Sequence, residues 1–194
     1  MYEKNFTEFG KDIAKLNKAV KLYLTKDAPR IVGVEAVNHF KRSFNDGGFT
    51  NTNLIGWKRS KRTDSGSIWY GFQYGAKSPV PNNHPRRWKT KSAYKARKPN
   101  AITNFSPAAI SRKTLTGSST ALRDSIRYRI EPGKTIVSSN MPYARIHNEG
   151  GTASVFGKGR AEIPKRQFIG HSTKLNARIK QRILKDISKL IKKQ

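Results

Sequence analysis

The sequence predicts an α+β fold in which an N-terminal helical hairpin and a long C-terminal helix pack on a small antiparallel sheet. Apolar residues recur at helical spacing near both ends of the chain. A strand–turn–strand pattern lies in the second half. A third feature, a basic and proline-rich middle, predicts a long basic loop or arm beside these elements.

Residues 5–24 predict an amphipathic helix. Its apolar residues follow each other at steps of three and four, which places them on one face: Phe6, Phe9, Ile13, Leu16, Val20 and Tyr23. Asp27 and Pro29 then predict the N-cap and early-turn proline of a second helix. That helix should end near Phe44, because the sequence NDGG at 45–48 is a strong stop. Two helices joined by a short link predict the hairpin.

The middle of the chain, residues 49–113, shows no regular period. It contains all three tryptophans and two basic clusters, WKRSKR at 57–62 and PRRWKTKSAYKARK at 85–98. Basic residues beside aromatic rings suit phosphate contacts combined with base stacking. The alternative is a solvated charged face whose tryptophans, such as Trp57, anchor the loop to the core. The residues that we expect to contact DNA or a partner protein are Lys58, Arg59, Lys61, Arg62, Arg86, Arg87, Trp88 and Lys89.

The second half predicts a succession of short elements. These are a helical turn within LTGSSTALRDSI (115–126), strands at RYRI (127–130) and TIVSS (135–139), a short helix within MPYARIHNEGG (141–151), an extended segment AEIPKRQFIG (161–170) interrupted by proline, and an amphipathic helix over 172–192. We therefore expect one domain over residues 1–194. It comprises N-terminal helices (1–48), an extended basic insertion or arm (49–113) and an α+β core with the C-terminal helix (114–194).

The formal net charge is +28 at pH 7, which favours a polyanionic neighbour such as nucleic acid or an acidic protein surface. The chain contains no cysteine, so disulfides, thiolate metal sites and cysteine nucleophiles are excluded. No apolar run approaches the ~20 residues that span a bilayer, and the N-terminus lacks the pattern of a secretory signal. We expect no membrane partner.

His147 and Glu149 are the most suggestive pair for chemistry, but their spacing is wrong. Metal ligands on a helix lie three or four residues apart, because only those positions share a face. The zinc deaminase pattern that begins with His-x-Glu also needs a later Cys-x-x-Cys. No paired-carboxylate motif, phosphate-binding loop or nucleophile elbow occurs either. We therefore expect no enzyme, no cofactor and no metal, and we interpret 141–151 as a glycine-capped helix in which His147 holds a local hydrogen bond.

The order of these elements resembles the phage virion morphogenesis or tail-completion proteins, the group that includes the Mu-like virion morphogenesis protein. The resemblance lies in LTGSSTALRDSI, the strand pair after it, PYARIHNEGG at 142–151, IPKRQFIGHS at 163–172 and the closing helix. Residues 37–62 also resemble some members. The motif residues, to which the resemblance implies structural roles, are Leu122, Ser125, Ile126, Tyr143, Ala144, His147, Gly150, Gly151, Pro164, Arg166 and Phe168.

The resemblance implies a structural protein of the virion at the head–tail junction, in tail completion, as a tail terminator or in the neck. It implies a ring of identical copies that contacts other neck, connector or tail-tube proteins, and host cytoplasm as the place of assembly. Genomic DNA in the channel would then face the basic residues. A stand-alone protein that binds nucleic acid without sequence preference is the alternative.

Overall fold

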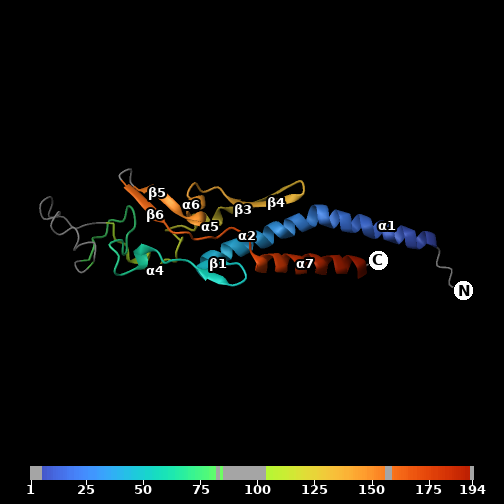
Figure 1. Cartoon of the computed structure of the whole chain (residues 1–194), viewed down its shortest axis with the longest axis horizontal. Helices are drawn as coiled ribbons and strands as arrows, with labels where there is room; N and C mark the ends of the chain where they lie inside the picture. The colour runs from blue at the N-terminus through green and yellow to red at the C-terminus, as the bar shows by residue number, and fades with distance from the viewer. Residues whose placement is uncertain (1–5, 82–83, 85–103, 156–158, 193–194) are drawn as a thin grey trace.

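The computed structural model describes residues 6–81, 84, 104–155 and 159–192. The molecule is elongated: the helices nearest the two termini occupy one end, a two-stranded ribbon at 126–139 lies alongside a further helix in the middle, and the remaining short elements and loops extend to the other end (Figure 1). This mixture of helices and small antiparallel strand pairs confirms the predicted α+β class.

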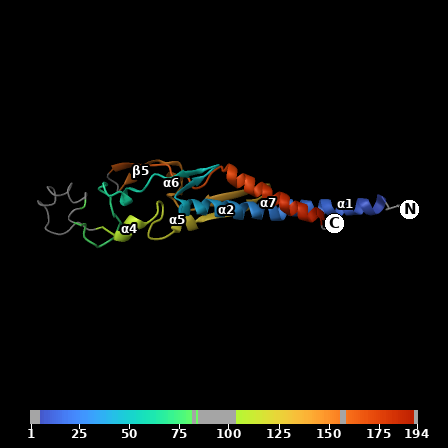
Figure 2. The ribbon, with the colours of Figure 1, turned by 90° about the horizontal axis from the view of Figure 1, so that it is seen from below.

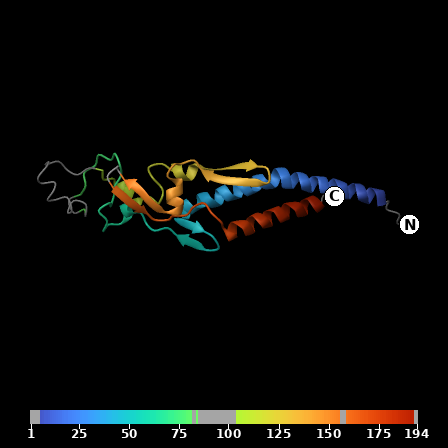
Figure 3. The ribbon, with the colours of Figure 1, turned by 45° about the horizontal axis from the view of Figure 1, so that its top comes forward.

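The predicted N-terminal hairpin is wrong, because the two helices are one. α1 (Phe6–Leu22) continues through a π-helical turn, Tyr23–Asp27, into α2 (Ala28–Asp46) without reversing (Figure 3). The N–H of Ala28 donates to the carbonyl of Tyr23, five residues back, and Asp27 makes no capping bond. Pro29 cannot donate a backbone hydrogen bond, and a widened turn before it avoids the clash of its ring with the preceding turn. The Asp-Ala-Pro sequence therefore marks a bulge within a helix.

α2 ends where the sequence predicted. Gly47 adopts the left-handed conformation, with φ +67°, and its N–H donates to the carbonyl of Ser43. The chain then enters the antiparallel pair β1 (Gly48–Thr50) and β2 (Leu54–Gly56). A 3₁₀ turn at Lys61–Thr63 and the short helix α4 (Pro107–Ser111) complete the regular elements described between 49 and 113. The second basic cluster lies outside the described residues, so the predicted arm stays a prediction.

The strands in the described part of the chain form three separate two-stranded ribbons instead of one sheet. After the short helix α5 (Ala121–Asp124), β3 (Ile126–Glu131) pairs with β4 (Lys134–Ser139) in antiparallel register. The turn between them holds Gly133 at φ +72°, as the Pro-Gly sequence predicted. The helix α6 (Ala144–Glu149) leads into β5 (Gly151–Val155), which pairs with β6 (Gly159–Ile163).

α7 (Thr173–Lys192) confirms the predicted C-terminal helix. It lies along α2 and the adjoining part of α1, so that α2 sits between the β3–β4 ribbon and α7 (Figures 1 and 2). Its first turn is capped by Ser172, whose Oγ accepts from the N–H of Leu175 at 3.1 Å and donates to the carbonyl of Thr50 at 2.8 Å. The start of α7 is thereby fixed to the β1–β2 ribbon.

One hydrophobic core joins the helices to the ribbons. Its buried members are Ala36, Phe40, Phe44, Phe49, Leu122, Ile126, Ala144, Phe168 and Leu175. The aromatic rings of Phe44 and Phe168 are 5.2 Å apart between centroids, which packs the end of α2 against the segment that follows β6.

Candidate functional site

The apolar motif residues converge on this core. Ile126, at the start of β3, is fully buried, and Phe168 is 1% exposed. Leu122 of α5 and Ala144 of α6 are buried in the same cluster. Three stretches of the chain, around 122–126, at 144 and at 168, thus share one packing centre, which accounts for the apolar part of the motif.

Hydrogen bonds fix the polar part of the motif around α6. Asn148 Oδ1 accepts from the backbone N–H groups of Phe168 and Ile169, both at 2.9 Å. The backbone N–H of Arg166 donates to the carbonyl of His147 at 2.8 Å. Sequence reasoning missed Asn148; the one signal it offers is a side-chain amide in the last turn of a glycine-terminated helix.

The double glycine that follows α6 is required by a close approach. Gly150 has φ +79°, and a Cβ there would lie 2.9 Å from the backbone nitrogen of Lys165. Gly151, at φ +131°, begins β5. β6 ends at Ile163, immediately before Pro164, and the residues that follow Pro164 lie against α6. At the other end of the motif, Ser125 Oγ donates to the carbonyl of Leu122 at 2.7 Å and bonds with Ser139 Oγ.

Two arginine side chains donate hydrogen bonds to backbone carbonyls of segments that are distant in the sequence. Arg166 is buried; its Nε donates to the carbonyl of Lys58 at 2.9 Å and its Nη2 to that of Arg59 at 3.3 Å. Arg62 donates through Nε and Nη2 to the carbonyls of Ala109, Lys113 and Thr116. Arg62 is therefore partly buried and links the 61–63 turn to α4 and to the segment that follows α4, while its predicted contact with DNA or a partner stays a prediction.

His147 lies on the inner side of α6. Its ring meets that of Tyr143 edge to face, with centroids 6.0 Å apart, and its Nδ1 is buried without a hydrogen-bond partner among the described residues. Burial, and then the charge of Arg166, lowers the pKa of His147. The hydrogen bond predicted for this side chain is not found at Nδ1. Glu149 instead pairs with Arg145 at 3.0 Å, so the two residues of the His-x-Glu pair act separately.

A cavity of about 290 Å³ opens beside His147. Its walls come from the 60–62 turn, the 114–122 segment, α6 and Arg166. The described part of the chain contains no group of three His, Asp or Glu residues placed to hold a metal ion.

The first basic cluster divides into an anchor and an exposed strip. Trp57 donates through Nε1 to the carbonyl of Gln167 at 2.7 Å, and its ring packs on Phe44 with centroids 5.5 Å apart. This geometry favours the anchoring interpretation for Trp57 over base stacking. Lys58, Arg59 and Lys61 are exposed. Arg86, Arg87, Trp88 and Lys89 lie outside the described residues, and contact of any of these residues with DNA or a partner stays a prediction.

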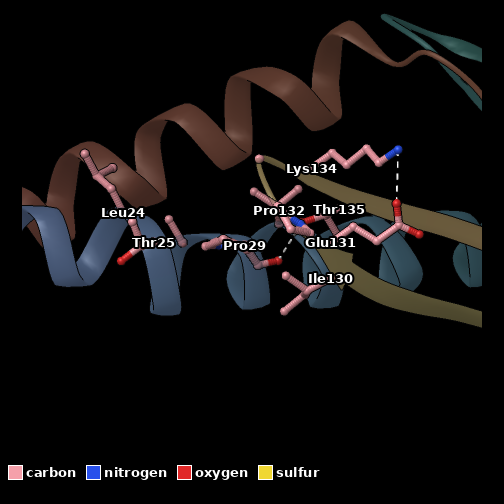
Figure 4. Close-up of a pocket in the computed structure, with 11 residues that line it drawn as sticks. Leu24, Thr25, Pro29, Ile130, Glu131, Pro132, Lys134 and Thr135 are labelled. Atoms are coloured by element: carbon pink, nitrogen blue, oxygen red, sulfur yellow. Dashed lines mark hydrogen bonds and ion pairs between the residues drawn. The ribbon is translucent and has the colours of Figure 1, made fainter.

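A second, larger hollow of about 700 Å³ lies where the π-turn meets the β3–β4 turn (Figure 4). Leu24, Pro29 and Ile130 contribute apolar walls, and Thr135 Oγ1 donates to the carbonyl of Pro29 at 3.1 Å across it. Lys134 and Glu131 form an ion pair of 3.0 Å at its rim. Leu24 and Ile130 are both exposed, so this hollow is uncovered apolar surface.

No helix among the described residues is long and apolar enough to cross a membrane. Comparison with curated proteins and with solved structures gives no match.

The model of the phage virion morphogenesis family matches residues 89–188, just over half of the chain. The match includes every motif residue from Leu122 to Phe168 and starts well before position 115, where the quoted resemblance begins. Residues 37–62 lie outside it. The motif around α6 therefore lies within the region that the family model covers, and the chain belongs to the phage virion morphogenesis family.

Proposed function

We propose that the protein is a non-catalytic structural component of the virion that acts at the head–tail junction, in tail completion, as a tail terminator or in the neck, and that identical copies assemble into a ring. Family membership supports a structural role in the phage particle. The proposed assembly is supported by the exposed apolar face of α1.

α1 has no buried residue, although its sequence is strongly amphipathic. Phe6 is 93% exposed, Phe9 is 65% exposed and Ile13 is 43% exposed, all on one face. The N-terminal part of the helix projects past the end of α7 (Figure 1). Large apolar side chains gathered on one exposed face mark a protein contact. We assign this face to a second copy of the chain, because a ring places the same two surfaces together at every interface.

The mass of the full chain in solution tests the assembly. The triple variant Phe6→Ser, Phe9→Ser, Ile13→Ser should fall to the mass of a monomer by light scattering, while the wild type has the mass of several copies. The matched control is Lys11→Gln, Lys15→Gln, Lys18→Gln, which changes the opposite face of the same helix and should keep the assembled mass. A monomeric wild type, or equal masses for all three proteins, contradicts assembly through α1.

Particles assembled without the protein test its station. Heads and tails that remain unjoined, or tails of defective length, support the head–tail junction. Normal infectious particles from a deletion contradict it.

The positive charge of the chain determines which partners we propose. A ring multiplies the +28 of each chain. Lys58, Arg59 and Lys61 would neutralise DNA phosphates if they face the channel, without reading bases. On the outside they would bind acidic surfaces of neck, connector or tail-tube proteins.

The exposed strip also supports a second candidate, stand-alone nucleic-acid binding without sequence preference. The variant Lys58→Gln, Arg59→Gln, Lys61→Gln should then weaken binding and reduce its salt dependence more than the control on α1, which removes the same charge. Changing Arg86, Arg87 and Lys89 together should have the same effect. Negligible binding at physiological salt would exclude this candidate.

A further inference from the structure

Two arginines and no Asp or Glu are among the described residues that line the cavity beside α6. Arg62 and Arg166 reach it from different segments. The other polar side chains in its walls are those of Ser60, Thr114, Ser118, Ser119, Tyr143 and His147. We call it the arginine cavity. Buried or partly buried charges in proteins are normally paired with an opposite charge, so two arginines without an acid are unusual.

The two guanidinium groups are only partly satisfied. Neither makes an ion pair with a described Asp or Glu. Each uses Nε and Nη2 on backbone carbonyls, and neither Nη1 has a hydrogen-bond partner among the described residues. Burial, and then the charge of Arg112, lowers the pKa of Arg62, whereas burial and then the charge of Arg62 lower the pKa of Arg166. The positive charge of Arg62 is therefore unfavourable for that of Arg166.

The remaining side chains add hydrogen-bond donors. His147 lies in the wall, with its Nδ1 buried and without a partner in the described part of the chain. Ser118 and Ser119 line the mouth as exposed residues whose hydroxyls make no hydrogen bond to another described residue. A hydroxyl can donate, and so can one nitrogen of a neutral imidazole. The cavity thus offers donors from the 60–62 turn, the 114–122 segment and Arg166.

We propose that the arginine cavity binds a phosphate-type oxyanion. A tetrahedral group with several acceptor oxygens meets donors that come from different directions, which a planar carboxylate with two oxygens does less well. The bound anion would compensate both guanidinium charges and give the 60–62 turn and the 114–122 segment a shared ligand. The same phosphate chemistry is available from free phosphate and from a nucleic-acid backbone. The proposal is independent of the ring.

Inorganic phosphate is the first probe, added to the full chain at constant ionic strength set with sodium chloride. Thermal unfolding should shift upward and saturate with phosphate, because a ligand that binds only the folded state stabilises it. Arg166→Gln should weaken phosphate binding about tenfold or more, the usual effect of losing a charged hydrogen-bond donor. Arg145→Gln, which removes an equal charge from the exposed side of α6, should leave binding unchanged.

Arg166 also holds the carbonyls of Lys58 and Arg59, so its variant could fail to fold. The double variant Ser118→Ala, Ser119→Ala removes two cavity donors without removing a hydrogen bond to any described residue. It should fold as the wild type does and bind phosphate several-fold more weakly. Two outcomes would overturn the proposal: stabilisation by phosphate that does not saturate, and stabilisation that is equal in this variant, Arg145→Gln and the wild type. Either outcome would mean that phosphate only screens the charge of a basic protein.

The imidazole nitrogens of His147 give a local readout by NMR. Phosphate should shift the His147 resonances, while those of the exposed His171 stay in place. No movement of His147 at saturating phosphate overturns the site, and so does an equal response to acetate at the same concentration.

A short DNA oligonucleotide then identifies the source of the phosphate group. If the oligonucleotide shifts His147 and competes with inorganic phosphate, the cavity takes a backbone phosphate. If phosphate shifts His147 and the oligonucleotide neither shifts it nor competes, the cavity takes a free phosphate. Both outcomes support an oxyanion site.

Discussion

The ring of Tyr128 lies directly on Gly33. A Cβ built at position 33 would be 2.3 Å from Cδ2 of Tyr128 and 2.5 Å from its Cγ. This contact lets α2 lie close against β3, and it explains why a glycine occupies the interior of a long helix, where glycine is otherwise unfavourable.

Gly33→Ala should therefore destabilise the protein, by about 1–3 kcal/mol, because the added methyl group overlaps a packed ring. Gly10→Ala is the matched control in α1, where a Cβ meets nothing within 4 Å. It should raise stability by about 0.5–1 kcal/mol through helix propensity alone. Urea unfolding of both variants measures the difference, and a stabilised Gly33→Ala would show that the helix and ribbon separate easily.

Asn148→Ala should cost about 1–3 kcal/mol of unfolding free energy. The substitution leaves the N–H groups of Phe168 and Ile169 without their shared acceptor at the edge of the core. Asn140→Ala, at an exposed position, should change stability by less than about 0.5 kcal/mol. Equal effects of the two variants would argue that α6 does not depend on this amide.

Trp57→Phe should lose about 1 kcal/mol, because phenylalanine keeps an aromatic ring beside Phe44 but cannot donate to the carbonyl of Gln167. Trp69→Phe is the control, since the indole nitrogen of Trp69 makes no hydrogen bond to a described residue, whereas its ring packs on Phe72. DNA affinity should be the same in Trp57→Phe and the wild type. A large loss of affinity in a folded Trp57→Phe protein would revive the stacking interpretation.

The stability of the fold should fall as the pH drops below about 6.5, the ordinary pKa of histidine. The folded state holds the pKa of His147 below that value by burial and by the charge of Arg166. The unfolded chain therefore binds this proton more readily, so the contribution is complete above pH 6.5 and is lost as the pH falls through the folded pKa. The pKa of His39 is lowered in the same direction, mainly by burial.

The variant His147→Gln should show a shallower loss of stability between about pH 7.5 and about pH 5.5 than the wild type, by urea unfolding. The variant retains the part of the pH dependence that is due to His39. Asp124 and Asp186 do not interfere, because their hydrogen-bonded partners lower their pKa values and confine their effect to more acidic solutions. Identical pH dependence in variant and wild type would exclude His147 as the titrating group.

Local signals made most elements predictable. The strand pair at 126–139 follows from a Pro-Gly turn between two segments with a strand pattern, and the ends of α2 and α6 follow from glycines that adopt positive φ. Asp27 and Pro29 misled the prediction of a hairpin, because the same residues suit a helix start and a π-turn. Whether ribbons join into one sheet depends on how they pack on α2, which no local pattern records.

The polar interior was harder to predict. Arg62 looked like one more member of an exposed basic cluster, but carbonyls of Lys113 and Thr116, more than fifty positions later, draw it inward. Arg166 was recognised only through the family motif, and nothing in its neighbourhood in the sequence predicts its bonds to Lys58 and Arg59. Such contacts arise from chain segments that meet only after folding.

The π-turn at Tyr23–Asp27 also gives the molecule a mechanical property. Because the helix is continuous from Phe6 to Asp46, α1 and α2 form one rod held at its base by the β3–β4 ribbon and α7. Tyr23 lies in the π-turn of this rod, and its side-chain hydroxyl donates a hydrogen bond to the carboxylate of Asp186 in α7. A force applied to the projecting tip acts as torque on that base, so an α1 held by a neighbouring subunit would set the tilt of every copy relative to the next.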